Sequence, residues 1–191
     1  MTRIIGIAGS LRQGSYNAAL LRNAVELAPA GCALEIATIK DIPLFDEDFE
    51  SQNGIPPPVA ALKDLVAGAD GLLLVTPEYN NSIPGVFKNA IDWMTRPSSD
   101  IARVFGDRPV GLIGTTPGGM GTSFAQTAWL PILRTLGTRP FFGKTLYVSG
   151  ANKVFDTEGR FTDKDLRERL RIYMEQFAAF VAAARASAKP K

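Results

Sequence analysis

The chain has 191 residues, 46% of them hydrophobic, and its 21 Lys and Arg against 19 Asp and Glu give a formal net charge of +2. This size and apolar content predict a single domain over residues 1–185 and a disordered tail over residues 186–191, and the absence of histidine excludes imidazole nucleophile pairs and imidazole metal ligands. Basic residues are interspersed with acidic ones and no apolar run approaches about 20 residues, so the sequence predicts binding to neither nucleic acid nor a membrane.

Short apolar runs alternate with stretches of helical period, which is the pattern of βαβ units around a parallel sheet with helices on both faces. We expect strands at residues 3–8, 34–39, 71–76, 110–114 and 145–149. We expect helices at residues 17–28, 57–67, 84–94, 122–136 and 163 to about 185. Thr162 and Asp165 resemble a capping box for the last helix. The connections 41–58 and 96–108 are predicted to be loops.

The single cysteine, Cys32, lies at the start of the second predicted strand and has no partner within the chain. An intramolecular disulfide and a cysteine-rich zinc site are therefore excluded, and a reducing compartment is the natural setting. Because the chain enters its first strand without a signal-peptide pattern, we expect a cytoplasmic protein. Cys32 is interpreted as a small apolar strand residue, with a redox-sensing thiol as the alternative.

The loop after the first strand combines hydroxyls, a guanidinium and an amide with the free N–H groups of a helix start. In a parallel sheet, ligands bind at the carboxyl ends of strands where the strand order reverses, so this loop is a candidate site. A helix N-terminus favours an anion, and each hydrogen bond to a charged group adds roughly 1.5–3 kcal/mol. The loop therefore predicts a phosphate site, with an ordinary polar helix cap as the alternative; its candidate ligands are Ser10, Arg12, Ser15 and Asn17.

Two known phosphate-binding motifs do not match this loop. Gly9 and Gly14 have the spacing of a P-loop, but Ser15 and Tyr16 stand where Lys and Ser or Thr are required. The glycines do not form the dinucleotide-binding pattern either, and no acidic residue at the end of the second strand is placed to hold a ribose.

Two further loops follow the third and fourth strands. Residues 76–85 frame Tyr79 with prolines and amides, which offers a flat wall and backbone donors to a planar heteroaromatic ligand, or else forms a plain turn with an exposed tyrosine. Residues 115–121 are rich in glycine, which permits close backbone approach to a ligand or a tight structural turn.

These motifs resemble the NAD(P)H-dependent FMN reductase family of the flavodoxin-like superfamily, in its bacterial quinone and chromate reductase branch. The resemblance rests on residues 9–17, 77–80 and 83–93 and covers nearly the whole chain. It implies a flavodoxin-like three-layer α/β sandwich, with helices on both faces of a five-stranded parallel sheet in the order 2-1-3-4-5.

The resemblance also implies a non-covalently bound FMN and NAD(P)H as co-substrate. The first loop is then expected to hold the phosphate, the second the isoalloxazine and ribityl groups, and the third the other side of the flavin. The cofactor-binding residues implied are Ser10, Arg12, Ser15, Tyr16, Asn17, Pro77, Glu78, Tyr79, Asn80, Thr116, Pro117, Gly118 and Gly119. No catalytic side chain is expected, because the flavin itself carries the redox chemistry.

The family's electron acceptors are small molecules such as quinones, flavins, azo compounds or chromate, and its members are typically homodimers or homotetramers. Candidate interface residues are Trp129, Leu130, Phe141 and Phe142. Two other interpretations stay open. One is a flavodoxin-like electron carrier that uses no nicotinamide, although the mixed charge lacks the acidic face such carriers use for docking. The other is a non-flavin module that binds a nucleotide or phosphorylated metabolite.

Overall fold

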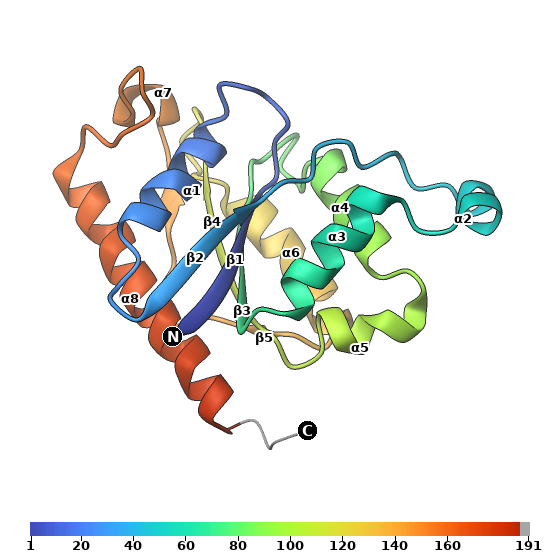
Figure 1. Ribbon diagram of the computed structural model, residues 1–191. Helices are drawn as coiled ribbons and strands as arrows, with labels where there is room; N and C mark the ends of the chain where they lie inside the picture. Colours follow the sequence, from blue (N-terminus) through green and yellow to red (C-terminus); the bar gives the residue numbers. More distant parts are fainter. Residues whose placement is uncertain (188–191) are drawn as a thin grey trace.

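The computed structural model describes residues 1–187 and shows a parallel β-sheet between two layers of helices (Figure 1). In spatial order the strands are β2 (Cys32–Ala37), β1 (Thr2–Ala8), β3 (Gly71–Val75), β4 (Pro109–Thr115) and β5 (Arg139–Pro140). All neighbouring strands are parallel. The expected α/β fold class and strand order are confirmed.

The fifth position of the sheet is divided between two short strands. β5 pairs with the first two residues of β4, and β6 (Tyr147–Val148) pairs with the last two. The strand expected over 145–149 is therefore present at its centre only. The pairing of residues 139–140 was not predicted, because a two-residue strand that contains a proline carries no periodic signal.

Between β5 and β6 the chain leaves the sheet, and side chains compensate for the missing strand. The Phe141 ring packs against Tyr173 and Phe177 of the last helix, with ring centroids 5.5 and 5.6 Å apart. The Tyr173 hydroxyl donates to the Leu112 carbonyl in the middle of β4, at 3.2 Å. Burial raises the pKa of Tyr173, so the phenol stays protonated and supplies a hydrogen bond that a continuous strand would have made.

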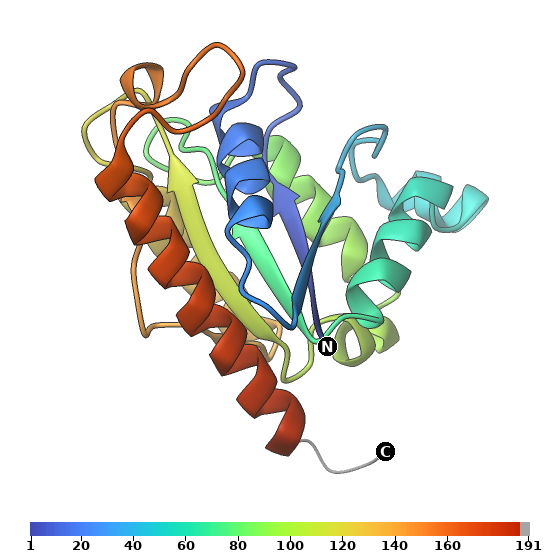
Figure 2. The same ribbon diagram turned by 60° about the vertical axis from the view of Figure 1, so that its left-hand side comes forward.

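Helices cover both faces of the sheet, as Figure 1 and the turned view in Figure 2 show. The layer on one face consists of α1 (Tyr16–Glu26) and α8 (Lys164–Ser187). The layer on the other face consists of α3 (Pro57–Ala67), α4 (Gly85–Met94) and α6 (Ser123–Thr135). None of the helices in the described part of the chain combines the length and apolar composition that a bilayer crossing requires.

The two central strands bury side chains on both faces. Ile4 and Leu73 belong to the core under α1 and α8, whereas their neighbours Ile5, Leu72 and Leu74 belong to the core on the other side. Since successive residues of a strand point to opposite faces, β1 from Ile4 onward and the whole of β3 must be apolar. This is why they were recognisable as short uninterrupted apolar runs.

The five predicted helices correspond to α1, α3, α4, α6 and α8. The prediction that Thr162 caps the last helix was wrong. The Asp163 carboxylate accepts the N–H groups of Asp165 and Leu166, at 2.9 and 3.0 Å, whereas the Thr162 hydroxyl donates to the Lys153 carbonyl. Residues 186 and 187 of the predicted tail are helical. Residues 188–191 of that tail lie outside the described residues.

Both long connections contain short helices that were not predicted, and another follows β6: α2 (Glu47–Asn53), η1 (Ser98–Asp100), α5 (Ile101–Val104) and α7 (Ala151–Val154). The helix α2 projects from the body of the molecule and buries none of its side chains (Figure 1). Its first turn is capped by Asp46. A helix without a buried stripe has no apolar period for sequence reasoning to detect.

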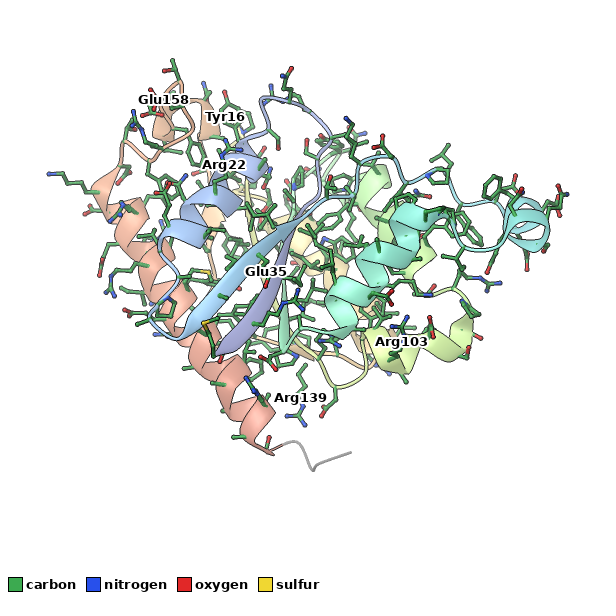
Figure 3. All side chains as sticks on the ribbon, viewed as in Figure 1. Tyr16, Arg22, Glu35, Arg103, Arg139 and Glu158 are labelled. Atoms are coloured by element: carbon green, nitrogen blue, oxygen red, sulfur yellow. The ribbon has the colours of Figure 1, made fainter. Side chains whose placement is uncertain are left out.

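The outer strand β2 carries a charged residue that is paired with a charge on its neighbour β1. Glu35 of β2 accepts two hydrogen bonds from Arg3 of β1, at 2.7 and 2.8 Å, and Figure 3 shows its place on the strand. A charged edge disfavours pairing with a strand of another molecule. Cys32, the first residue of β2, is half-buried, and burial raises the pKa of its thiol, which fits its interpretation as a structural residue.

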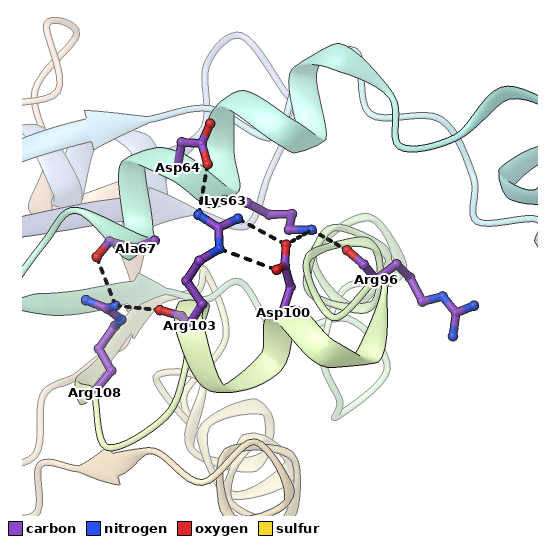
Figure 4. A network of polar contacts seen from close by, with 7 residues as sticks. All are labelled: Lys63, Asp64, Ala67, Arg96, Asp100, Arg103 and Arg108. Atoms are coloured by element: carbon purple, nitrogen blue, oxygen red, sulfur yellow. Dashed lines mark hydrogen bonds and ion pairs between the residues drawn. The ribbon is translucent and has the colours of Figure 1, made fainter. Parts of the chain in front are cut away.

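A polar network joins α3 to the connection after α4 (Figure 4). The Lys63 side chain is only 4% exposed; its ammonium forms an ion pair with Asp100 at 2.7 Å and donates to the Arg96 carbonyl. Arg103 bridges Asp100 and Asp64. Hydrogen bonds from Arg103 and Lys63 lower the pKa of Asp100 to about 2. The network thus compensates a buried ammonium that would otherwise oppose folding.

The network predicts an acid-dependent loss of stability that depends on Asp100. Its pKa is about 2 when folded, against about 3.9 in an unfolded chain. The stabilisation of the folded state by ionised Asp100 is therefore fully present above about pH 4 and is lost as the pH falls through about 2. Urea unfolding from about pH 5 to about pH 2 should show a smaller fall in unfolding free energy for Asp100→Asn than for the wild type or the exposed Asp165→Asn. Parallel curves for all three proteins would contradict this prediction.

Candidate functional site

The carboxyl ends of β1, β3 and β4 open into a cleft of about 310 Å³. The chain leaves β1 towards β2 over one face of the sheet and reaches β3 over the other, so the strand order reverses at this point. The cleft is lined by Ser10, Arg12, Ser15, Tyr16, Asn17, Pro77, Glu78, Tyr79, Thr115, Thr116 and Pro117. All three loops singled out from the sequence contribute to it.

The cleft brings together all the predicted site residues except Asn80, Gly118 and Gly119, which do not line it. Thr115 lines it but was not among the predicted residues. The predicted strand ended one residue before Thr115, and only the pairing of β4 with β6 shows that the strand continues to this residue. The sequence signal for it was its place at the start of the glycine-rich loop 115–121, directly after a buried apolar run.

The loop after β1 presents hydrogen-bond donors to the cleft. Ser15 is the N-cap of α1, and its hydroxyl oxygen accepts the Ala18 N–H at 3.2 Å, which leaves the hydroxyl hydrogen for another acceptor. The N–H groups of Tyr16 and Asn17, in the first turn, have no acceptor within the helix. Together with the positive end of the helix dipole, this arrangement suits a phosphate.

The guanidinium of Arg12 supplies the positive charge of this wall. It lies over the Tyr16 ring, 5.2 Å from the ring centroid, and donates to the Gly14 carbonyl. Within residues 1–187, no carboxylate forms an ion pair with Arg12. Its charge is therefore available to an anionic ligand.

The side chain of Asn17 links two walls of the cleft. Its amide nitrogen donates to the Thr115 carbonyl at 2.9 Å, and its amide oxygen accepts the Thr115 N–H at 3.0 Å, in a buried setting. The side chain is thus engaged with the end of β4, and the backbone N–H of Asn17 is what remains for a ligand.

A tight hairpin shapes the loop after β3. Tyr79 and Ser82 exchange backbone hydrogen bonds of 3.1 and 3.0 Å, and the residues between them, Asn80 and Asn81, have φ of 50° and 60°. Two left-handed residues in succession define a type I′ turn, which asparagine tolerates. The Tyr79 ring is left half exposed at the cleft, while the N–H groups of Glu78 and Asn80 donate to none of the described residues.

Glu78 fixes the same loop to a helix that follows the next strand. Its carboxylate accepts the N–H of Ala125, in the first turn of α6, at 2.9 Å. Thr122, at the N-cap position, makes no side-chain capping bond and has a left-handed backbone. A carboxylate at a helix N-terminus is stabilising, so Glu78 replaces the missing cap. Sequence reasoning missed this role because the two partners are far apart in the chain.

The loop after β4 is held by the end of β6 and by the segment that follows it. The backbone N–H of Thr116 donates to the Val148 carbonyl at 3.0 Å, and the backbone carbonyl of Thr116 accepts the Ala151 N–H at 3.1 Å. Gly150 donates to the Gly118 carbonyl at 3.3 Å. This segment, which carried no predicted function, therefore positions the third wall of the cleft.

The residues present fit FMN. The hydroxyl oxygen of Thr115 is the one buried side-chain polar atom among the described residues that has no hydrogen-bond partner, and Thr115 lines the cleft. Buried polar atoms normally have partners, so this one indicates a polar ligand. The start of α1, with its free N–H donors, lies at one part of the cleft and the exposed Tyr79 ring at another, which suits a phosphorylated heteroaromatic ligand.

Comparison with known proteins gives concordant matches. A family model described as NADPH-dependent FMN reductase matches residues 2–153. An NAD(P)H-dependent FMN reductase of Pseudomonas aeruginosa is 38% identical over 179 residues, covering 94% of this chain and 95% of that protein. A 2-hydroxy-1,4-benzoquinone reductase of a Burkholderia species is 36% identical, covering 94% and 96%. The fold is similar to that of FerB, a flavoenzyme NAD(P)H:(acceptor) oxidoreductase from Paracoccus denitrificans, with a TM-score of 0.85, 30% identity, and coverage of 96% and 99%.

The link between Asn17 and Thr115 predicts a stability effect. Asn17→Ala should lower the unfolding free energy by about 2 kcal/mol, because it leaves a buried N–H and a buried carbonyl without partners. Urea unfolding of the protein without ligand measures this. The matched control is Gln13→Ala, at an exposed position of the same loop, which should change stability by less than about 0.5 kcal/mol. Equal effects of the two substitutions would show that the link is energetically unimportant.

Proposed function

The chain belongs to the NADPH-dependent FMN reductase family, and from this premise we propose that its cleft binds FMN and that small quinones are its electron acceptors. The enzyme is an NAD(P)H-dependent flavin oxidoreductase. The observation that carries the proposal is one cleft, at the reversal of strand order, which combines an unpaired arginine at a helix start with a half-exposed tyrosine. The orphaned hydroxyl of Thr115 in the same cleft supports it.

The start of α1 is the proposed phosphate site. Ser10 and Ser15 offer hydroxyl donors, Tyr16 and Asn17 offer first-turn N–H groups, and Arg12 adds a formal charge. A phosphate held by a helix start and a guanidinium gains charge-assisted hydrogen bonds, which are the stronger kind. Such a site would favour FMN over a flavin that lacks the phosphate.

The loops after β3 and β4 form the proposed ring site. Pro77 and Tyr79 provide flat apolar surface, and the free N–H group of Glu78 is the proposed donor to the polar edge of a flavin. Bound FMN supplies the redox chemistry, taking reducing equivalents from NAD(P)H and giving them to the acceptor. The protein contributes position, and backbone donors that stabilise negative charge.

The proposal extends to assembly and setting. Leu11, Tyr79, Met120 and Phe124 are each about half exposed and come from the loops around the cleft and the start of α6. An exposed apolar rim of this kind is typical of an interface, so a second copy of the chain is proposed to cover it in a homodimer or homotetramer. Trp129, one of the interface candidates, is fully buried and unable to contact a partner. A free cysteine fits a cytoplasmic setting.

Anaerobic reduction tests the enzyme as a whole. Protein loaded with FMN should lose its visible flavin absorbance on addition of NADPH or NADH and regain it on addition of 1,4-benzoquinone. Single-turnover absorbance measurements in a stopped-flow instrument follow both steps. A flavin that binds but is reduced by neither nicotinamide would favour an electron carrier, and protein that binds no FMN would favour a non-flavin module.

The phosphate site is tested by Arg12→Ala. Loss of the guanidinium should weaken FMN binding by more than roughly tenfold, or about 1.4 kcal/mol, while riboflavin binding stays unchanged because riboflavin lacks the phosphate. Flavin fluorescence titration measures both affinities. Arg22→Ala, an exposed arginine of the same helix, is the matched control and should bind FMN as the wild type does. Unchanged FMN affinity in Arg12→Ala would remove Arg12 from the site.

A further inference from the structure

Arg12 belongs to a series of stacked groups that reaches well beyond the cleft. Its guanidinium lies over the Tyr16 ring, and that ring stacks on Phe155, with centroids 6.1 Å apart and planes at 15°. Phe155 in turn stacks on Phe161, at 4.7 Å and 18°. Two aromatic rings from the segment after β6 therefore support the ring that carries the arginine.

The base of this stack is fixed to α1. Phe155 and Phe161 pair in an antiparallel bridge. Asn23 of α1 donates to the Gly159 carbonyl at 2.7 Å and accepts the Phe161 N–H at 3.3 Å. Figure 3 shows this corner of the molecule, with Tyr16 on α1 close to the loop that carries Glu158. The stack is thus tied to the same helix whose first turn is the proposed phosphate site.

A long arginine side chain gains from such support. Unsupported, it samples many rotamers, and ligand binding must then restrict them at an entropic cost. A guanidinium held over an aromatic ring is already restricted before the ligand arrives. The Tyr16 hydroxyl makes no hydrogen bond with any described residue, so the ring is the part of Tyr16 that matters to Arg12.

We propose that Tyr16 is a positioning residue, whose ring, supported by Phe155, holds the Arg12 guanidinium where the phosphate of FMN binds. This inference rests on the proposed function, since it concerns the same cleft. It differs from direct binding of the flavin by Tyr16, because the effect passes through Arg12 and concerns the phosphate alone.

A double-mutant cycle on Tyr16 and Arg12 tests the inference. Tyr16→Leu should weaken FMN binding roughly three- to tenfold, as loss of a cation–π contact implies. Tyr16→Phe, which keeps the ring, should bind FMN as the wild type does, and none of the Tyr16 variants should change riboflavin affinity. In the Arg12→Ala background, Tyr16→Leu should have no further effect, because the two residues act as one unit.

A second variant covers the case in which Tyr16→Leu does not fold. Phe155 lies outside the cleft lining, so Phe155→Leu changes the support of Tyr16 without removing a group of the cleft. It should weaken FMN binding and leave riboflavin binding unchanged. Phe49→Leu, at an exposed phenylalanine of α2 outside both the stack and the cleft, is the matched control and should change neither affinity. Thermal unfolding of each variant checks that it is folded.

Three results would overturn the inference. Equal losses of FMN and riboflavin affinity in Tyr16→Leu would mean that Tyr16 contacts the ring system or only supports the fold. Additive effects in the double variant would mean that Tyr16 and Arg12 act independently. FMN affinity that depends on Arg12 but not on Tyr16 or Phe155 would refute the positioning role and leave the proposed function intact, whereas wild-type protein that binds no FMN would refute the proposed function itself.

Discussion

The paired hydrogen bonds between the Asn17 amide and the Thr115 backbone are the interaction on which the geometry of the cleft depends. They join the first turn of α1, which follows β1, to the end of β4. β1 and β4 do not pair with each other because β3 lies between them, so no backbone ladder makes this connection. Because the contact is buried, its loss would leave polar groups unsatisfied. The wall formed by the start of α1, which is the proposed phosphate site, and the wall that carries the unpartnered Thr115 hydroxyl are thereby held at a fixed distance.

The other walls are fixed in the same way, by polar groups that reach over from a neighbouring unit. Glu78 caps α6 from the loop after β3, and the backbone around Ala151 holds the loop after β4. Each loop is therefore anchored by an element that does not adjoin it in sequence. A binding site whose loops are ordered before the ligand arrives loses less entropy on binding.

The sheet explains why these anchors are effective. β1 and β3 are buried on both faces and form a rigid platform, and the loops depart from it in the same direction. The polar side chains that line the cleft occur where the platform ends, so the apolar core and the cleft do not compete for the same positions. The buried network around Lys63 lies elsewhere, between α3 and the connection after α4, and stabilises that layer without touching the cleft.

The sequence by itself determined the α/β class, the three loops of the site and most of the residues that line the cleft, because apolar periodicity and helix caps are local properties of the chain. Resemblance to a family added the strand order and the cofactor. Only the tertiary structure decided that Asn17 binds Thr115, that Glu78 caps α6, that Tyr173 replaces part of a strand, and that Phe155 supports Tyr16. These contacts join residues that are far apart in the chain. The crossover connections of the fold bring such residues together in space, and no local sequence pattern encodes those connections.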